Sequence, residues 1–482
     1  MEVTASTQAA LATGADTIVV GVFADEGVAH DFGDRTLEGL LDRGEARRAF
    51  KHLAVVHDSE RRVILAGLGA RERFGAEQAR AVAAAALDRA GELGAQALCW
   101  ELPHHVADEI AGGLVEGTLL RAYRFTRYRP ARDADRLPQR LLVSAHHDVS
   151  AAVLAAGIVA RAQNRARDLA NTPGNDLPPA ALAEYAQQTA ERLPALAVRT
   201  LDEEAIRAAG MGAFAAVAQG SAQAARLIEI RYEPPGAAGP LLGFVGKSVT
   251  FDSGGLSLKP PRTMFGMKFD MAGGAAVLEA MAAVAELELP VRILGVLGAT
   301  ENLPDGRAVK PGDIVRAMDG TTVEVNNTDA EGRLILADCL LHARAGGAEQ
   351  LVDVATLTGG VVTALGSVHA GLFTSDEALA ELMQAAAVRS GELIWRLPLH
   401  PEYARMVHGR YAQLTNLAER SEAQAIVGAE FLHHFAGEVP WAHLDIAGMS
   451  DDVPRPYFAP KLATGFGVRL LVELARAFAG QL

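Results

Sequence analysis

The sequence predicts an α/β protein with two domains joined by a helix. Short apolar runs, typical of buried strands, alternate with alanine-rich helical patterns in both halves of the chain. An unbroken helical pattern over residues 148–169 separates these regions, and a length of 482 residues exceeds that of one typical domain. We therefore expect a three-layer α/β domain over residues 1–147, a linker helix over 148–171, and a larger α/β domain over 172–482. We expect the sheet of the larger domain to be mixed and mostly parallel.

In the N-terminal domain, the expected strands are short apolar runs, and the expected helices follow alanine-rich patterns. The expected strands are Thr17–Phe23, His52–His57, Arg62–Leu68, Ala97–Leu102 and Arg140–Ser144. The expected helices are Ala76–Leu93 and Val106–Ala122.

In the C-terminal domain, the strand patterns are apolar on both faces, as in parallel strands that helices cover on both sides. The expected strands are Leu241–Val245, Val291–Leu297, Leu351–Ala355 and Ala442–Ile446. The expected helices include Gly273–Glu286 and Gly332–Ala345. We expect the chain to leave the first of these strands at Gly246.

The composition excludes several classes of protein. Half of the residues are hydrophobic and 22% are charged, which argues against disorder, collagen and coiled coil. The net charge of −14 disfavours non-specific binding to nucleic acid or to a membrane surface. Cys99 and Cys339 lie among apolar neighbours and are expected to be buried, inert thiols. The N-terminus shows no signal peptide pattern, so we expect a cytoplasmic location.

Two segments allow other interpretations. Residues 354–375 carry no Asp, Glu, Lys or Arg, and this uncharged segment is long enough to span a bilayer. They also contain four glycines, so we interpret them as buried in protein. Seven arginines lie among aromatic residues between Arg121 and Arg140, a combination that can bind single-stranded nucleic acid. We interpret this segment as a solvated loop.

Acidic residues gather where strands of the C-terminal domain are expected to end. In open α/β sheets ligands bind beyond the carboxyl ends of the strands. The acidic residues near this edge are Asp252, Asp270, Asp329 and Glu331. Each alone could be a helix cap or a turn residue, but converging carboxylates repel one another unless a cation neutralises them. Four carboxylates without cysteine suit two divalent ions: Zn²⁺, Mn²⁺, Mg²⁺ or Co²⁺.

Histidine is not expected to form a competing metal site. Three pairs of adjacent histidines occur, at 104–105, 146–147 and 433–434, and adjacent side chains point in different directions. A His-Glu-x-x-His motif is absent from the sequence, and no strand end carries a Gly-x-Ser-x-Gly motif.

Several motifs in order resemble those of the leucyl aminopeptidase family, the cytosol aminopeptidases with two metal ions. The most specific is NTDAEGRL at residues 327–334. The others are DLANTP at 168–173, VGK at 245–247, FDSGG at 251–255, MKFDM at 267–271, DVATLTG at 353–359, WAHLDIAG at 441–448 and ATGFG at 463–467. The resemblance covers roughly the last two thirds of the chain.

The resemblance implies a role for each matching residue. The metal ligands would be Lys247, Asp252, Asp270, Asp329 and Glu331, with Asp252 and Glu331 bridging the two ions. Lys259 would polarise the substrate carbonyl, and Arg333 would hold a bicarbonate that acts as general base. The first substrate side chain would contact Met267, Asn327, Thr356, Gly359 and Ala447, with the Leu357 carbonyl near the bound amine.

The expected activity is the release of N-terminal amino acids, leucine and other apolar residues preferred, from peptides. The resemblance also implies a homohexamer built as two trimers. Two alternatives remain. One is a DNA-binding accessory factor, which only the arginine segment supports; the other is a two-metal enzyme that hydrolyses phosphate esters.

Overall fold

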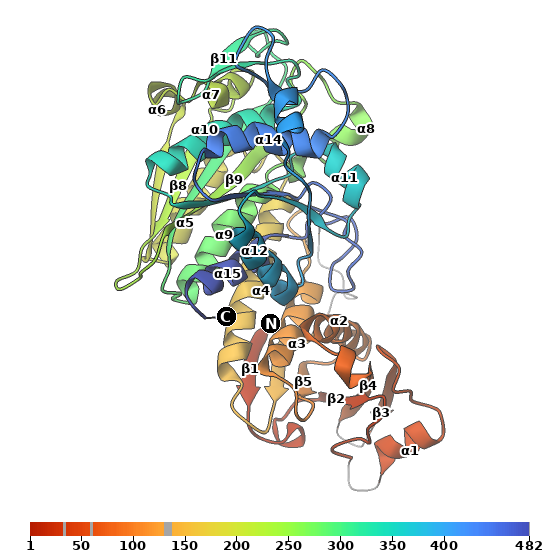
Figure 1. The fold of residues 1–482 in the computed structure, drawn as a ribbon. Coiled ribbons are helices and arrows are strands. Elements are labelled where there is room, and N and C mark those ends of the chain that lie inside the picture. Colours follow the sequence, from red (N-terminus) through yellow and green to blue (C-terminus); the bar gives the residue numbers. More distant parts are fainter. Residues whose placement is uncertain (32–34, 58–60, 130–136, 482) are drawn as a thin grey trace. The chain divides into compact units, whose positions relative to one another are not determined.

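The computed structural model describes residues 1–481 except 32–34, 58–60 and 130–136. The chain forms two compact units (Figure 1). The first comprises Met1–Arg161 with Arg455–Ala459, and the second comprises Ala162–Pro454 with Pro460–Leu482. The expected α/β class, with an N-terminal domain and a larger C-terminal one, is confirmed. Helix α4 (Ser150–Asn171) begins in the first unit and ends in the second. The boundaries expected at 147 and 171 stay predictions.

The first unit contains a six-stranded sheet in the order β1-β6-β5-β2-β4-β3, parallel except for β3. Its strands are β1 (Glu2–Ser6), β2 (Thr17–Phe23), β3 (Leu53–His57), β4 (Arg62–Gly69), β5 (Ala97–Glu101) and β6 (Arg140–Ser144). Its helices are α1 (Thr36–Asp42), α2 (Ala76–Glu92) and α3 (Asp108–Ala122), with short 3₁₀ turns at Ala10–Ala12 and Arg71–Arg73.

Central strand β2 shows that the sheet is the middle layer of this unit. Six of its seven residues are buried, so both of its faces are covered. Ile18 and Val20 pack in one cluster with Leu37 and Leu40 of α1. Helices α2 and α3 pack against each other, and α2 also contacts β4. The strand β1 and the helix α1 had no counterpart among the expected elements.

The second unit contains an eight-stranded mixed sheet in the order β15-β14-β17-β13-β9-β10-β8-β7. Its strands are β7 (Leu196–Leu201), β8 (Arg226–Tyr232), β9 (Leu241–Asp252), β10 (Arg292–Asn302), β13 (Gln350–Ala355), β14 (Ala370–Phe373), β15 (Ile394–Arg396) and β17 (Trp441–Asp445). The four central strands β17, β13, β9 and β10 are mutually parallel. A small second sheet has the order β11 (Ile314–Arg316), β12 (Thr322–Glu324) and β16 (Leu414–Thr415).

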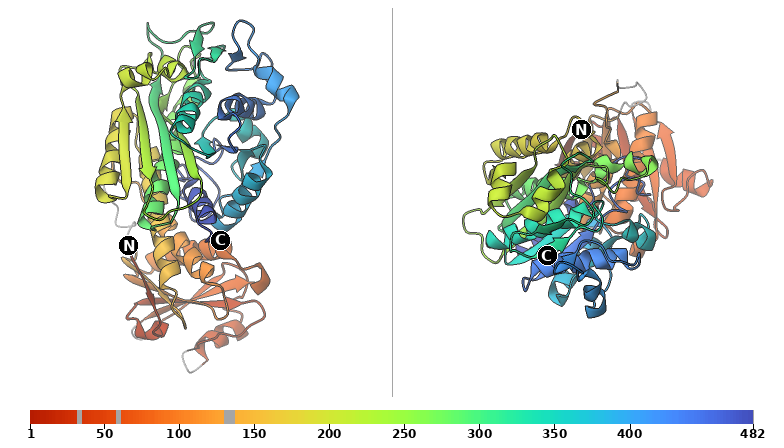
Figure 2. Two further views of the ribbon diagram at one scale, coloured as in Figure 1. Left: turned by 60° about the vertical axis from the view of Figure 1, so that its left-hand side comes forward. Right: turned by 90° about the horizontal axis from the view of Figure 1, so that it is seen from above.

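Helices cover both faces of the large sheet (Figure 2). The helices of this unit are α5 (Pro179–Arg192), α6 (Glu203–Ala208), α7 (Gly212–Ala218), α8 (Pro261–Met264), α9 (Ala272–Glu286), α10 (Glu331–Ala345), α11 (Gly359–Leu365), α12 (Glu377–Ser390), α13 (Pro401–Ala404), α14 (Gln424–Ala436) and α15 (Val468–Phe478), with 3₁₀ turns at Met267–Phe269 and Arg405–Val407. A Cβ at Gly298 of β10 would contact α10 and α7, whereas one at Gly295 would contact α9, so these helices lie on opposite faces.

The expectation that the chain leaves β9 at Gly246 is wrong. Strand β9 continues to Asp252, because β10 stays paired with it as far as Asn302 opposite Asp252. A shift of register between Thr300 and Glu301 accommodates this extension. Polar residues that seemed typical of a loop are therefore strand residues, and the rigid strand itself carries Lys247 and Asp252.

Three further expectations can be compared with the structure. Cys99 and Cys339 are buried, and burial raises the pKa of the Cys99 thiol to about 11. Within the described part of the chain, no helix has the length and apolar character needed to cross a membrane. Arg121 pairs with Asp88 at 2.8 Å, while residues 130–136 of the arginine segment lie outside the described residues.

Candidate metal centre

The parallel strands of the large sheet bring the expected site residues to one edge. Strand β9 carries Lys247 and ends at Asp252. The adjacent strand β13 ends at Ala355, and β17, on the other side of β13, ends at Asp445. Because parallel strands end at the same edge of a sheet, the segments that follow β9, β13 and β17 gather there. The remaining charged groups come from four places: Lys259 follows β9, Asp270 precedes α9, Asp329 precedes α10, and Glu331 and Arg333 lie in the first turn of α10.

Three carboxylates form the centre of this site. Asp252, Asp329 and Glu331 each offer an oxygen, and these atoms lie within 4.8 Å of one another. Two lysines lie between the acidic groups. Lys247 Nζ is 2.8 Å from Asp270 and 2.7 Å from Glu331. Lys259 Nζ is 2.8 Å from Asp252 and 2.5 Å from Asp329.

The carboxylates are held by polar groups that fix their orientation. One oxygen of Asp252 accepts hydrogen bonds from the Gly254 amide and from the Asn302 side chain, both at 2.8 Å. Asp270 accepts a hydrogen bond from Thr356 Oγ1 at 2.7 Å. The Asp329 amide donates to Asn327 Oδ1 at 2.8 Å. The acidic groups are therefore arranged before any ion binds.

The protein alone does not balance the charge at this site. Burial raises the pKa of Asp252 to about 8, and the nearby Glu331 and Asp270 carboxylates contribute to this rise. Burial likewise raises the pKa of Asp270 to about 6, against the opposing charge of Lys247. Four carboxylates face two lysines, which leaves two formal negative charges. A divalent cation would compensate this excess negative charge.

Without an ion, Lys247 is held in its charged form by the neighbouring carboxylates. Burial opposes its charged form, but Asp270, Glu331 and Asp252 together outweigh burial, so the pKa of Lys247 is raised. This is the balance without an ion. A divalent cation at the carboxylates would repel the ammonium and favour the neutral amine, the only form that can bind a metal.

A buried oxygen of Glu331 without a hydrogen-bond partner in the described part of the chain indicates a place where a cation can bind. Glu331 is 2% exposed, and its Oε2 atom has no hydrogen-bond partner among the described residues. Buried carboxylate oxygens are normally satisfied, so such an atom calls for an ion or a ligand. Oxygen donors and one amine, without thiolates, suit Mn²⁺, Zn²⁺, Mg²⁺ or Co²⁺.

The two expected catalytic side chains have different surroundings. Lys259 forms ion pairs with Asp252 and Asp329, and its pKa is raised. Arg333 donates to the Asn416 carbonyl at 2.7 Å, but its Nε atom has no partner within the described chain. Burial lowers the pKa of Arg333 to about 10, so it stays protonated at neutral pH. A buried guanidinium with an unused donor is suited to hold an anion.

Asp445 organises the segments expected to contact the substrate. Its Oδ1 atom accepts the amides of Leu357 at 3.1 Å and Ala447 at 3.2 Å, and its Oδ2 accepts Thr358 Oγ1 at 2.6 Å. One buried carboxylate thus ties the segment after β13 to the segment after β17. Gly359 is exposed, and a Cβ there would meet open space.

The other expected substrate residues lie next to the acidic groups. Thr356 accepts a hydrogen bond from Lys247 Nζ through its carbonyl at 2.9 Å. Met267 begins the 3₁₀ turn that leads to Asp270. The carbonyl of Asn327 accepts the side-chain amide of Asn416 at 2.6 Å. The structure therefore brings all thirteen expected site residues to one region, and their individual roles stay predictions.

Sequence reasoning missed three positioning residues, Asn302, Asn416 and Asp445. Asn302 donates to both Asp252 and the Thr328 carbonyl, and Asn416 contacts the Arg333 side chain and the loop before α10. Asn302 and Asp445 lie at strand ends, which was a usable signal. Asn416 comes from a distant loop without any pattern of its own.

Gly254 explains why glycine is needed beside the acidic groups. Its φ of +87° lies in the left-handed region, and a Cβ there would be 2.7 Å from Asp329 Oδ1. Any larger residue would push against the Asp329 carboxylate.

Carboxylates, an amine donor and a buried arginine with an unused donor lie at the carboxyl ends of the parallel central strands, an arrangement typical of a metal-dependent α/β enzyme. Comparison with known proteins identifies it further. The model of the Cytosol aminopeptidase family, catalytic domain, matches residues 164–472, and that of the N-terminal domain of the same family matches residues 19–131. The chain belongs to the cytosol aminopeptidase family, and it is a metal-dependent aminopeptidase.

Individual relatives agree with this family. A probable cytosol aminopeptidase of Roseiflexus castenholzii is 40% identical over 99% of both chains. One of Solibacter usitatus is 41% identical over 96% of both. Among solved structures, the bottromycin maturation enzyme BotP in complex with Mn superposes with a TM-score of 0.88. It is 36% identical, and the match covers 97% of this chain and 100% of that one.

Proposed function

We propose that this protein is a two-metal aminopeptidase that removes leucine and other apolar residues from the N-terminus of peptides. The observation that carries the proposal is the meeting of Asp252, Asp329 and Glu331 within 4.8 Å, next to Lys247. With Asp270, these groups would hold two divalent ions, and Asp252 and Glu331 would bridge them. Asp252 and Glu331 are each 2% exposed, so the proposed bridging ligands are the most deeply buried of the three carboxylates.

Bound divalent ions would supply Lewis-acid activation of the scissile carbonyl and of the attacking water. The chain itself supplies the remaining charges. Lys259 lies at the rim of the acidic cluster, and its side chain is 15% exposed, so its ammonium can reach the carbonyl oxygen of a substrate. A fixed positive charge at that position stabilises the negative charge that develops in the transition state.

Arg333 would hold the general base. Its buried charge forms no ion pair with a carboxylate among the described residues, and its Nε donor is unused. A bicarbonate bound to Arg333 would supply general-base catalysis for the attacking water. The arginine therefore acts through the anion that it binds.

The substrate is held by its free N-terminal amine and its first side chain. The Leu357 carbonyl would accept a hydrogen bond from the amine, and the segments tied by Asp445 would form the wall of the side-chain pocket. Met267, Thr356 and Ala447 offer apolar surface, which favours leucine. Asn327 and Gly359 complete this wall.

We further propose that the protein acts in the cytoplasm as a homohexamer of two trimers, with peptides as its partners and without membrane or nucleic acid. Mn²⁺ is the first ion to test, because the solved relative BotP is in complex with Mn. Zn²⁺ is the second.

The test compares three substrates with the Mn²⁺-loaded protein. Leucine anilide should be hydrolysed, whereas N-acetyl-leucine anilide, which lacks the free amine, should not be. A phosphomonoester separates the proposal from a phosphatase at the same metal site. Chelation should abolish activity and Mn²⁺ should restore it; full activity without detectable metal, or preference for the phosphomonoester, would contradict the proposal.

A further inference from the structure

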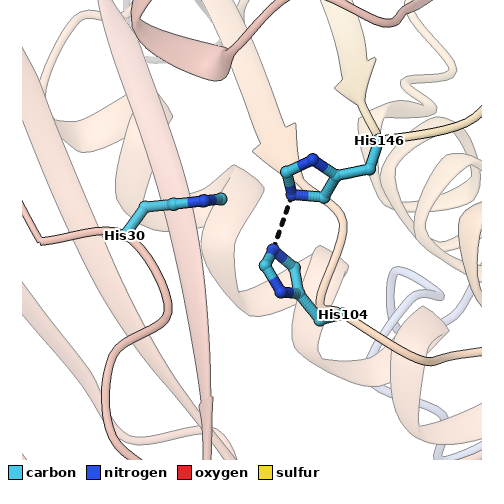
Figure 3. A group of neighbouring side chains, drawn as sticks. All are labelled: His30, His104 and His146. Carbon is cyan, nitrogen blue, oxygen red and sulfur yellow. Dashed lines mark hydrogen bonds between the residues drawn. The ribbon is translucent and has the colours of Figure 1, made fainter.

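A second cluster of metal-binding side chains lies in the first unit, apart from the acidic site. His30, His104 and His146 each offer a ring nitrogen, and these atoms lie within 4.8 Å of one another. His104 Nε2 and His146 Nε2 face each other at 2.6 Å (Figure 3). The ring of His30 lies 4.9 Å from that of His104 and 5.2 Å from that of His146, measured between centroids.

The topology of the first sheet explains why these residues meet. Strands β6, β5 and β2 are adjacent and parallel. His146 follows β6, His104 follows β5, and His30 lies in the loop after β2. All three therefore lie beyond the carboxyl ends of neighbouring parallel strands, the place where open α/β sheets bind ligands.

The expectation that histidine forms no metal site considered only adjacent pairs, whereas this cluster joins histidines from three different loops. Adjacent histidines do point in different directions, as expected. His147, next to His146, pairs instead with Asp108 at 2.7 Å. The divergence lets His104 and His146, each from a different pair, meet His30 from a third loop, which no local spacing could show.

We propose that His30, His104 and His146 bind a divalent transition metal ion, with Zn²⁺ as the representative ion. Three neutral imidazoles form a common zinc ligand set, which leaves one position for water. A cavity of about 300 Å³ borders the cluster and is lined in part by His30, Glu101 and His146, which gives room for that water.

Glu101 supplies a carboxylate that can orient one of the histidine ligands. It is the last residue of β5, and its carboxylate forms a hydrogen bond with His30 Nδ1. A metal-bound histidine typically donates its other ring nitrogen to a carboxylate, which fixes the ring and increases the basicity of the ligating atom. With Nδ1 as the donor, Nε2 of His30 is left as the ligand.

The loops that carry the histidines are held in place by a neighbouring ion pair. Glu26, in the loop of His30, pairs with Arg71, and two of the distances are 2.5 and 2.7 Å. Arg71 also donates to the His104 carbonyl at 3.0 Å. One guanidinium thus connects the His30 loop to the His104 loop, and the cluster is largely formed before an ion binds.

The distance between the two facing nitrogens is shorter than the distance between two ligand atoms of a bound zinc ion. Two ligands of tetrahedral zinc lie about 3.3 Å apart, given zinc–nitrogen distances of about 2.0–2.1 Å. His104 Nε2 and His146 Nε2 are 2.6 Å apart, so these rings must separate slightly. His146 is exposed at the surface, where such a small rotation meets little resistance.

The test counts zinc on the full-length protein. Chelator-treated protein is dialysed against buffered free Zn²⁺, and the zinc bound per chain is measured by mass spectrometry. The wild type should bind one equivalent more than His30→Ala, His104→Ala or His146→Ala. The matched control His147→Ala removes a neighbouring histidine outside the cluster and should bind as much zinc as the wild type.

Glu101→Gln gives a graded result. It keeps the three ligands, so it should reach the same zinc count at saturation, with an apparent affinity weaker by about 10–100-fold.

Because the His30 side chain is 48% exposed, His30→Ala should fold normally, which circular dichroism can verify.

Two results would overturn the proposal: equal zinc counts in the wild type and the folded cluster variants, or an equal loss of zinc in His147→Ala. The readout is independent of the proposed function, because the acidic site contributes the same number of ions in every variant. Failure of the peptidase assay would leave the difference in zinc count unchanged.

Discussion

At the scale of single residues, Arg333 is predicted to act on the rate and not on metal binding. It lies in the first turn of α10 and donates to the Asn416 carbonyl, and it forms no ion pair with the described carboxylates. Arg333→Ala should keep the metal content and lower kcat by about 10²–10³. Arg344→Ala, at the other end of the same helix, is the control and should keep kcat. Wild-type turnover in Arg333→Ala without added bicarbonate would contradict this role.

The pair Lys259 and Asp329 separates catalysis from metal binding. The two side chains are 2.5 Å apart, yet the proposed roles differ. Asp329→Ala should lose metal together with activity, because it removes a ligand. Lys259→Ala should keep the metal and lower kcat by about 10²–10³, because it removes only charge stabilisation. Metal analysis beside steady-state kinetics distinguishes them, and loss of metal in Lys259→Ala would make that residue a ligand or a structural support.

At the scale of elements, helix α9 packs so closely on the sheet that Gly273 cannot be replaced. A Cβ there would be 2.1 Å from the Val354 carbonyl oxygen of β13, which is backbone and cannot move aside. Gly273→Ala should lower the free energy of unfolding by about 1–3 kcal/mol, measured by urea denaturation. Gly306→Ala, where a Cβ would meet open space, should leave it nearly unchanged. Equal stability of the two variants would show that α9 can shift.

At the scale of the whole molecule, the acidic site should make stability depend on both pH and metal. The pKa of Asp252 is raised by burial to about 8, above its ordinary value of about 3.9. Between these values the folded protein holds a proton that the unfolded chain releases, so the free energy of unfolding of chelator-treated protein decreases as pH rises.

Bound ions compensate the ionised carboxylates and remove this loss. The difference in melting temperature between metal-loaded and chelator-treated protein should therefore widen from about pH 5 to about pH 8. Differential scanning calorimetry at several pH values measures it. A difference that stays constant over this range would show that the carboxylates are already ionised without metal.

Assembly should respond to salt. Each subunit carries a net charge of −14, so a hexamer must overcome repulsion through extensive apolar contact. Phe265 and Tyr411 of the second unit are 89% and 75% exposed and offer apolar surface for such contact. Light scattering at micromolar concentration should give a hexameric mass, more stable at 0.5 M than at about 0.05 M salt because salt screens the repulsion. A monomeric mass would contradict the assembly.

The elements that could be predicted from the sequence are those whose pattern is local. The bounds of Thr17–Phe23 and Arg140–Ser144 agree with β2 and β6, because apolar runs of this length are buried wherever they lie in a sheet. The continuation of β9 to Asp252 could not be predicted, because it depends on pairing with β10, whose own extension contains a shift of register. Strand β1 was missed for a similar reason: its residues are half-exposed at the sheet edge.

The sequence by itself determined which acidic groups to expect at one site, because Asp252, Asp329 and Glu331 lie beside glycines in the segments near strand ends. Only the tertiary structure decided what surrounds them, such as Asn416, which reaches Arg333 across 83 residues of sequence. The same holds for His30, His104 and His146. They come from three loops, and only the order of β6, β5 and β2 in the sheet brings their nitrogens within 4.8 Å. Spacing along the chain determines local structure, whereas the order of strands determines which distant side chains meet.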